Sequence, residues 1–422
     1  MEKGKSSNKK DEVYAVIDLK SFYASCECAA RGLDIFSTPL VVADPTRSIN
    51  TIVMSSTPYL KEKYGIPNVC RVKSLPKVPE LIFAQPRMAY YIEMSAKVVS
   101  IFLDFIDEED IHVYSIDESF LHLSPYLSLY KTTPEGLCKM IQERIKNELG
   151  LVATCGIGPN MFLAKTCLDN EGKKKPPFLA RWDKKDIKEK LWKISPITNV
   201  WGISSGIASR LEKMGIRSLE ALANTDVELL EKEFGIIGHQ LFDLSNGIDN
   251  TDIRKKYVPK ENSLSLGQTL MKDYDGKGAR LVLREMCDDL CFRLRLHESK
   301  CGLVSVSVAY SGGGGFSKQR ALDVYSDDND ALYSAIRNIF NSLYNGEKIR
   351  GLYISFGKLI PFSSLQPNLF ENYEEALEKR NLNLAIDNIH KIYGSNSVLR
   401  ASSGLKDSTI KVRHGQIGGH KS

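Results

Sequence analysis

The stretch Tyr114-Ser115-Ile116-Asp117-Glu118-Ser119-Phe120 places two adjacent carboxylates inside an otherwise apolar run with the character of a β-strand. Neighbouring acids in a half-buried hairpin repel each other and lose hydration, so folding alone gives no reason to keep them. A divalent cation would offset both costs. A third acid, Asp18, ends the apolar run of residues 13–17. Three hard oxygen ligands from two strands favour Mg²⁺, which binds carboxylates, water and substrate phosphates.

The three acids predict a nucleotidyl-transfer site that uses two metal ions. In such a site one cation activates the attacking hydroxyl, and the other binds the triphosphate and stabilises the leaving pyrophosphate. A single Asp at a strand end is more often a turn former. The prediction therefore depends on the coincidence of Asp18 with the adjacent pair Asp117 and Glu118.

Strands and helices alternate along the first half of the chain, which indicates an α/β core. The expected strands are residues 13–18, 39–43, 51–54, a hairpin at 112–123 and 152–157, and the expected helices are 21–31, 59–64, 88–105, 134–149 and 160–168. The hydrophilic segment 169–177, with three consecutive lysines and two prolines, predicts a linker or domain edge.

The second half has a different pattern. Residues 184–247 predict short helices without a strand, followed by a mixed segment with a helix at 280–298 and strands at 303–310 and 352–356. The sequence after residue 361 begins without the regular spacing of apolar residues that would indicate a helix or a strand. The Gly-, Ser- and Lys-rich ending, residues 400–422, predicts a tail that is mobile unless it is bound.

Composition narrows the class of protein. A chain of 422 residues is too long for one core, and hydrophobic and charged fractions of 42% and 26% are those of a soluble protein. Nine cysteines without any C-x-x-C pair favour reduced thiols over a disulfide frame or zinc site. The longest apolar stretch, residues 98–106, is far short of the roughly 20 residues of a membrane span, and we expect a cytoplasmic protein without membrane contact.

The net charge of +5 is unevenly distributed. Residues 253–324 hold thirteen Lys or Arg and only eight Asp or Glu, so this segment carries an excess of positive charge. A basic segment is often no more than a solvated face. A basic segment can also bind a polyanion by contacting the phosphate groups of that polyanion.

The run Asp18-Leu-Lys-Ser-Phe-Tyr-Ala-Ser-Cys-Glu27, followed later by Ser115-Ile-Asp-Glu118, resembles the Y-family translesion DNA polymerases. The similarity is greatest to the UmuC-like branch of ImpB/MucB/SamB type, and extends in order from Val13 to at least Phe370. The resemblance implies an α/β multi-domain right-hand polymerase with a helical thumb and a C-terminal α/β little finger. The implied domains are the palm (11–21 and 86–177), fingers (22–85), thumb (178–250), little finger (255–360) and a tail (361–422).

The resemblance also implies roles for single residues around the acids. The metal positions are Asp18, Leu19, Asp117 and Glu118, with two Mg²⁺ ions. Beside the incoming nucleotide lie Phe22 and Tyr23, with Tyr23 as the sugar gate that excludes a ribose 2′-hydroxyl. The triphosphate ligands are Ser56, Tyr59 and Lys165.

Two of these roles have ordinary alternatives, and one neighbouring position departs from the family. Tyr23 could be a core aromatic residue, and Lys165 a surface lysine whose stem packs on an amphipathic helix. Many relatives carry a basic residue three positions after the tyrosine, whereas this chain has Glu62 between Lys61 and Lys63. Either a neighbouring lysine takes that role or the contact is absent.

Contacts to DNA are implied in the thumb and the little finger. Residues 200–216 resemble a helix-hairpin-helix, whose backbone N–H groups at Gly202 and Ser204 bind duplex phosphates. Ser204 stands where the second glycine is usual, and a plain helix turn is the alternative. In the little finger, the candidate backbone contacts are Ser263, Ser265, Lys318 and Arg320.

The pentapeptide Gln366-Pro-Asn-Leu-Phe370 matches the motif by which bacterial polymerases bind the sliding clamp. An extended peptide can place Leu369 and Phe370 in an apolar pocket while the amide of Gln366 makes paired hydrogen bonds. The alternative is a loop whose apolar side chains fold back on the preceding domain.

These observations predict an error-prone DNA polymerase for translesion synthesis, which transfers a nucleotide from a dNTP to a primer 3′-hydroxyl. Its partners would be primer-template DNA, the sliding clamp, and a recombinase or other damage-response proteins. A palm-type nucleotide cyclase is one alternative, but it needs neither hairpin nor clamp peptide. A non-catalytic repair factor that binds DNA or the clamp is the other.

Overall fold

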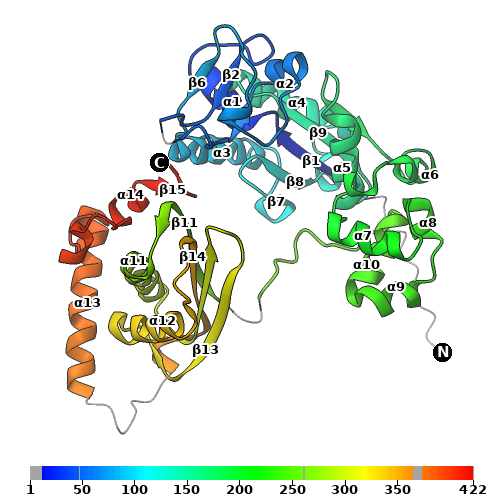
Figure 1. Ribbon diagram of the computed structural model, residues 1–422. Helices are drawn as coiled ribbons and strands as arrows, with labels where there is room; N and C mark the ends of the chain where they lie inside the picture. Colours follow the sequence, from blue (N-terminus) through cyan, green and yellow to red (C-terminus); the bar gives the residue numbers. More distant parts are fainter. Residues whose placement is uncertain (1–11, 47, 260–261, 365–372, 422) are drawn as a thin grey trace. The chain divides into compact units, whose positions relative to one another are not determined.

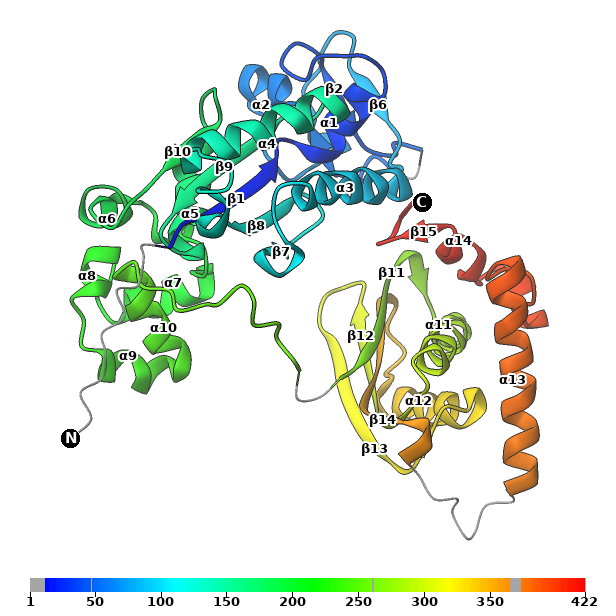
Figure 2. The ribbon, with the colours of Figure 1, turned by 180° about the vertical axis from the view of Figure 1, so that it is seen from behind.

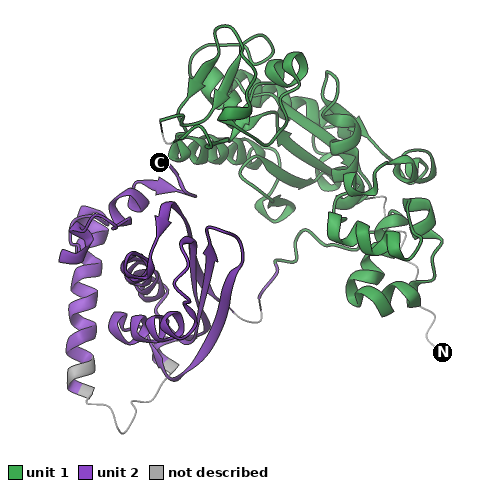
Figure 3. Cartoon of the chain, in the orientation of Figure 1, with its two compact units in different colours: residues 1–256 green, residues 257–422 purple. Residues whose placement is uncertain are grey.

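The structure is a computed structural model that describes residues 12–46, 48–259, 262–364 and 373–421 (Figure 1; seen from behind in Figure 2). The chain divides into two compact units, residues 1–256 and 257–422 (Figure 3). All nine cysteines are free thiols, so no disulfide links any part of the chain. Among the described helices, none is both long and apolar enough to cross a membrane.

A five-stranded sheet forms the centre of the first unit, in the order β10-β9-β1-β8-β7. Its strands are β1 (Tyr14–Leu19), β7 (Ile111–Val113), β8 (Glu118–His122), β9 (Ala153–Gly158) and β10 (Leu179–Arg181). The central strand β1 pairs antiparallel with both β8 and β9. Both faces of β1 are covered, so the side chains that point to either face are buried. This explains why apolar residues follow one another in this strand without polar residues between them.

Helices cover both faces of this sheet. Ala15 and Ile17 of β1 belong to a core that includes side chains of α3 (Met88–Leu103) and α4 (Pro134–Leu149). Val16 points to the opposite face, where it packs with residues of α5 (Met161–Cys167). Since side chains alternate along a strand, Asp18 lies on the same face as Val16 and therefore on the side of α5.

Capping residues explain where α4 begins and ends and where α5 begins. Thr133 accepts a hydrogen bond from the Gly136 N–H at the start of α4, and Gly150 ends this helix with a φ of 66°. Asn160 caps α5 by accepting a hydrogen bond from the Leu163 N–H at 2.8 Å.

A smaller region inserted after β1 holds two short sheets. Its elements are α1 (Phe22–Ala29), β2 (Leu40–Val42), β3 (Ile52–Val53), β4 (Ser55–Ser56), α2 (Pro58–Tyr64), β5 (Cys70–Arg71) and β6 (Ile82–Ala84). The first helix is shorter than the predicted 21–31, and the predicted strand 51–54 shrinks to two residues. Ser21 has a left-handed backbone with φ of 49°, which sets α1 off from the end of β1.

The last part of the first unit is helical, as its sequence predicts. Its helices are α6 (Asp186–Glu189), α7 (Ser205–Lys213), α8 (Leu219–Ala223), α9 (Val227–Phe234) and α10 (Ile236–Ser245). They share a core with the adjoining residues of α5, which include Phe162 and Leu163.

The second unit is a four-stranded antiparallel sheet with two helices on one face (Figure 1). In chain order its elements are β11 (Leu264–Tyr274), α11 (Gly276–Leu296), β12 (Ser299–Tyr310), β13 (Gly315–Ser326), α12 (Asn329–Leu343) and β14 (Ile349–Pro361). The strand order is β11-β14-β12-β13, which leaves β13 at an edge. The apolar sides of α11 and α12 bury Val304, Val306 and Val308 of β12.

The expectation of an irregular ending is wrong for the described residues after 372. They form α13 (Tyr373–Tyr393), α14 (Ile410–His414) and a hairpin of β15 (Gln416–Ile417) and β16 (His420–Lys421). Composition misses this region because polar contacts hold it, not a large core. Arg413 contacts Asp289 on α11 at 2.8 Å, and Thr409 donates its backbone N–H to Glu285 at 3.0 Å.

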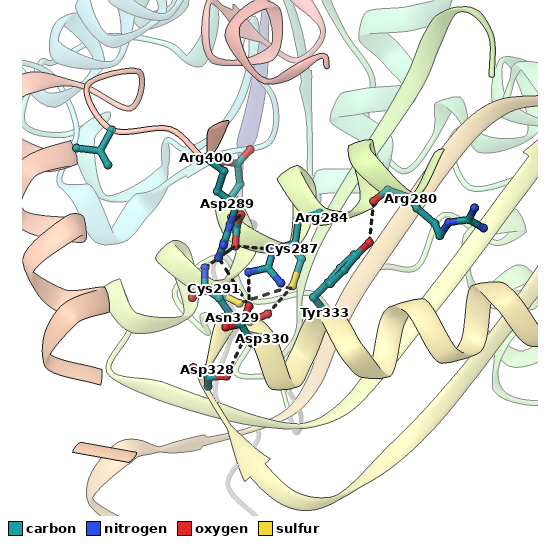
Figure 4. A network of polar contacts seen from close by, with 12 residues as sticks. Arg280, Arg284, Cys287, Asp289, Cys291, Asp328, Asn329, Asp330, Tyr333 and Arg400 are labelled. Atoms are coloured by element: carbon teal, nitrogen blue, oxygen red, sulfur yellow. Dashed lines mark hydrogen bonds and ion pairs between the residues drawn. The ribbon is translucent and has the colours of Figure 1, made fainter. Parts of the chain in front are cut away.

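Ion pairs on α11 offset part of the positive charge of the basic segment, residues 253–324. Arg284 reaches Asp330 at the start of α12, and Arg400 lies 3.9 Å from the same carboxylate (Figure 4). Arg295 is buried with Asp387 of α13. Arg284 and Arg295 are thus 13% and 3% exposed and paired within the unit, so they add little to a positive outer surface.

Candidate active site

Asp18 and Glu118 are direct cross-strand partners in the register of β1 and β8. Their side chains lie on the α5 face of the sheet and are 16% and 9% exposed. Burial raises the pKa of both carboxyl groups above the usual values. Two desolvated acids side by side are costly unless cations lie next to them.

Asp117 stands just before β8 and is held differently. Its backbone carbonyl accepts a hydrogen bond from the Leu19 N–H at 2.9 Å, and its side chain accepts one from the Ser115 hydroxyl at 2.8 Å. The charge of Asp117 adds to the effect of burial in raising the pKa of Asp18 and of Tyr23. Asp117 is therefore near both the acid pair and the predicted sugar gate.

Two lysines supply the positive charge beside the acids. Lys165 Nζ lies 2.8 Å from Glu118 Oε1 and 3.1 Å from Asp169 Oδ2. Lys173 Nζ lies 2.9 Å from Asp18 Oδ2 and 3.0 Å from Asp169 Oδ1. Asp169 thus bridges the two lysines, and the five side chains form a chain of alternating charge that begins at Glu118 and ends at Asp18.

Asp169 and Lys173 are functional candidates that the sequence analysis missed. They fall in the segment 169–177, which was expected to be a linker. Instead the chain continues from α5 as one π-helical turn over Leu168–Gly172, which keeps these side chains at the sheet. The signal was the spacing of four residues from Lys165 to Asp169 and again to Lys173, which is typical of paired charges on a helix.

Glycines in β9 let this helix approach the sheet. A Cβ on Gly158 would meet the Ala164 backbone nitrogen at 2.5 Å, and one on Gly156 would meet the Ala164 carbonyl oxygen at 2.4 Å. The close packing places Lys165, which is buried, within reach of Glu118. In the predicted phosphate role, its ammonium group would have to leave this carboxylate.

The acid pair has the donor chemistry of a divalent-cation site. Asp18 and Glu118 offer hard carboxylate oxygens with little hydration, and both oxygens of Glu118 lie within 2.9 Å of the Lys165 ammonium group, where a cation is already accepted. Within the described residues, however, no three acid, His or Cys side chains are already arranged to hold a metal ion. Instead, ammonium groups lie against Asp18 and Glu118, and the Ser115 hydroxyl donates a hydrogen bond to Asp117.

The two aromatic residues predicted to contact the nucleotide lie at the start of α1, which follows Asp18 closely in the chain. Phe22 is buried, whereas Tyr23 is half-buried and stacks on Tyr91 with ring centroids 4.7 Å apart. Tyr91 in turn donates a hydrogen bond from its hydroxyl to Glu27 at 2.8 Å. The tyrosine ring is therefore held in place from one side by a fixed neighbour.

The predicted triphosphate ligands of the smaller region lie on β4 and α2. Ser56 is buried, and the Tyr59 hydroxyl accepts a hydrogen bond from Lys63 at 2.7 Å. Glu62 is exposed, while Lys61 is half-buried on the same helix. Burial lowers the pKa of Lys61, and the positive charges of Lys20 and Lys173 lower it further.

In the helical part of the first unit, the predicted hairpin has a left-handed glycine. Gly202 has a φ of 94°, and Ser204 accepts a hydrogen bond from the Ile207 N–H at 3.4 Å as the N-cap of α7. The serine that replaces the usual glycine thus has a structural role in starting the helix.

The four DNA-contact candidates of the second unit do not share one face of the sheet. Ser265 pairs with Ser355, and cross-strand pairing continues through Ser305 to Gln319, so these side chains lie together on the face without helices. Ser263 precedes Ser265 by two residues and is exposed. Lys318 and Arg320 point to the opposite face but are exposed, since β13 is the edge strand. The clamp-peptide residues Gln366, Leu369 and Phe370 lie outside the described residues.

The fold and the sequence of this chain are both similar to those of known proteins. A Y-family DNA polymerase chimera of Dbh and Dpo4 superposes with a TM-score of 0.66 and 19% identity, over 83% of this chain and 99% of that one, so the fold is that of a Y-family DNA polymerase. Residues 17–169 match the impB/mucB/samB family, and residues 261–369 match the C-terminal domain of the same family.

Relatives match over nearly the full length. The chain is 35% identical to the putative UV-damage repair protein UvrX of Bacillus subtilis (strain 168), over 96% of the chain and 97% of the relative. It is 31% identical to DNA polymerase IV 2 of the same organism, over 97% and 99%. The chain belongs to the impB/mucB/samB family of Y-family translesion DNA polymerases. It is a DNA-directed DNA polymerase, as its sequence predicted.

Proposed function

We propose that this polymerase carries out error-prone translesion synthesis, with Asp18, Asp117, Glu118 and Leu19 holding two Mg²⁺ ions. The cross-strand pair of Asp18 and Glu118 on the palm sheet is the observation that supports this most. Bound divalent cations would activate the primer 3′-hydroxyl and stabilise the leaving pyrophosphate. The palm would be residues 11–21 with 86–177, and the fingers residues 22–85. The thumb would be residues 178–250, and the little finger residues 255–360.

The protein's own side chains would bind and orient the substrates. Lys165 would turn from Glu118 to the phosphates, with Ser56 and Tyr59 as hydrogen-bond donors to the same group. Gly202 and Ser204 at the start of α7 would contact duplex phosphates, and the exposed residues Ser263, Ser265, Lys318 and Arg320 would add contacts from both faces of the little finger. Such contacts give affinity that falls with salt and carries no base specificity.

Primer extension on an undamaged template and across an abasic site tests this function. The purified protein with Mg²⁺ and four dNTPs should extend both primers and insert wrong nucleotides often. A cyclase would instead convert ATP alone. A non-catalytic repair factor would bind the DNA and extend neither primer, which would contradict the proposal.

Replacing Tyr23 by Ala should let the enzyme insert ribonucleotides. The tyrosine ring stacked on Tyr91 cannot easily yield to a 2′-hydroxyl, and overpacking of this kind costs about 1–3 kcal/mol. The preference for dNTP over rNTP should therefore fall by up to about 100-fold, measured as a ratio of kcat/KM values. Tyr23→Phe keeps the ring and should keep the preference. An unchanged ratio in the alanine variant would remove the gate role.

The clamp peptide is tested by replacing Leu369 and Phe370 together with Ala. We expect distributive synthesis to continue at the wild-type rate, while stimulation by the sliding clamp is lost, because the apolar anchors supply most of the binding energy of such peptides. Extension products are compared with and without clamp loaded on a primed circle. Stimulation that survives the double substitution would show that the clamp, if bound, is bound elsewhere.

A further inference from the structure

Two aromatic side chains join the turn that carries Asp117 to the turn that precedes α7. The indole N–H of Trp201 donates a hydrogen bond to the Tyr114 hydroxyl at 3.3 Å, and the two rings meet edge to face with centroids 6.0 Å apart. Both rings also contact Phe120 of β8, at 5.6 Å from Tyr114 and 5.9 Å from Trp201. The three rings form one aromatic cluster between segments that are 87 positions apart in the chain.

Tyr114 begins a closed turn that leads into β8. The backbone N–H groups of Tyr114 and Ser115 both donate hydrogen bonds to the Glu118 carbonyl, each at 3.0 Å. The Ser115 hydroxyl also donates a hydrogen bond to the Asp117 carboxylate at 2.8 Å. Because these bonds fix the turn, a shift of Tyr114 would move Asp117 and Glu118 with it.

Trp201 lies in a second fixed turn of the same compact unit. The Ile203 N–H donates a hydrogen bond to the Val200 carbonyl at 3.1 Å, and the side chains of both residues are buried. Gly202 has a φ of 94°, which glycine adopts without strain. The Trp201 ring packs against a core cluster that includes Val16 of β1. The proposed contact to duplex phosphate at Gly202 is therefore one residue from the ring that touches Tyr114.

The contact between the two rings gives the fold little stability. Tyr114 is 48% exposed, and Trp201 is only partly buried. A neutral hydrogen bond between partly exposed groups adds little net free energy of folding, because water would serve both groups nearly as well. What the pair does fix is the distance between the backbone at Gly202 and the turn that ends in Glu118.

Nucleotidyl transfer depends on this distance. The backbone at Gly202 would hold the duplex that carries the primer, whereas Asp117 and Glu118 would hold the cations that activate its 3′-hydroxyl. The reacting atoms must lie about 3–3.5 Å apart and in line, and a misplacement of about 1 Å can cost on the order of 100-fold in rate. A direct contact between the two turns limits such misplacement.

We infer that Tyr114 and Trp201 are positioning residues, which set the distance from the duplex contact at Gly202 to Asp117 and Glu118 and so align the primer 3′-hydroxyl for attack. Trp201 acts through the adjoining Gly202, and Tyr114 acts through the turn that it begins. This inference rests on the proposed function, because it concerns the alignment of substrates in the same reaction.

Single-turnover insertion separates alignment from binding. The full-length enzyme, bound to primer-template DNA, receives one complementary dNTP and Mg²⁺, and the reaction is quenched at short times over a range of dNTP concentrations. For Tyr114→Leu and Trp201→Leu, the rate at saturating dNTP should fall about 10-fold to 100-fold. The dNTP concentration that gives half the maximal rate, and the DNA affinity from fluorescence anisotropy, should both stay within about twofold of the wild type.

Matched variants complete the experiment. Tyr114→Phe keeps the ring against Phe120 and should retain more of the rate than Tyr114→Leu. The double variant should be no slower than the slower single variant, because the two side chains act through one contact. Tyr393→Leu makes the same change at an exposed tyrosine of α13 and should keep the wild-type rate. Thermal melting by circular dichroism checks the fold, and the half-exposed Tyr114 keeps the inference testable if Trp201→Leu does not fold.

Three results would overturn the inference. The first is a rate within about twofold of the wild type in both leucine variants, and the second is a double variant in which the two losses multiply. The third is weaker DNA binding with an unchanged rate at saturating DNA and dNTP, which would make the pair a DNA contact. If the wild type extends primers while any of these holds, the proposed function stands, whereas a wild type that extends no primer contradicts that function.

Discussion

Glu118→Gln is expected to slow primer extension at least about 1000-fold while DNA binding stays at the wild-type level. The substitution keeps the size of the side chain but removes the charge that would hold a divalent cation next to the 3′-hydroxyl. Loss of transition-state stabilisation of this kind costs several kcal/mol, and each 1.36 kcal/mol is a factor of ten in rate. Single-turnover extension measures the rate, and fluorescence anisotropy of labelled primer-template measures binding.

The control for this experiment is Glu109→Gln, which changes an exposed acid just before β7. It should extend primers at the wild-type rate. Lys165 keeps Asp169 as a partner in Glu118→Gln, so the fold should survive, and circular dichroism checks this. Extension within tenfold of the wild type in the glutamine variant would remove Glu118 from the metal site.

Asp387→Ala is expected to destabilise the second unit by about 3–5 kcal/mol. Asp387 binds Arg295 through two hydrogen bonds, at 2.6 and 2.9 Å, and the two side chains are 6% and 3% exposed. Removing one partner leaves a buried guanidinium without its counter-charge, which is the costly way to break such a pair. Urea unfolding gives the free-energy change, and hydrogen exchange on α11 and α13 shows whether the helix detaches first.

Glu378→Ala on the same helix provides the comparison, because this side chain is exposed and should change stability by less than about 0.5 kcal/mol. Primer extension by Asp387→Ala at low temperature should remain near that of the wild type, since the pair lies in the second unit, whereas Asp18 and Glu118 lie in the first. If urea unfolding of Asp387→Ala matched that of Glu378→Ala, the buried pair would not anchor α13.

The sequence predicted the strands and helices around the central sheet of the first unit well because their signals are local. A continuous apolar run ending in Asp18, an amphipathic helix between Thr133 and Gly150, and the hairpin before Leu123 each follow simple rules of spacing and capping. The pairing of Asp18 with Glu118 then follows from where the two strands end.

The errors lie where polar contacts decide the structure. Residues 169–177 looked like a linker because of their lysines and prolines, yet Asp169 and Lys173 are held by contacts to Lys165 and Asp18 that no local pattern reveals. The same holds for the C-terminal helices, whose anchors on α11 are ion pairs and hydrogen bonds from residues about a hundred positions away. The side of the sheet on which Lys318 lies also depends on strand register, which composition does not fix.

The register between β1 and β8 links the activity of the enzyme to its folding. Asp18 and Glu118 are one hundred positions apart and meet only when these two strands have paired correctly. A slip by a single residue would turn Glu118 to the opposite side of the sheet and bring a different side chain beside Asp18. During refolding from denaturant, the rate at which polymerase activity returns would therefore report the rate at which this long-range contact forms.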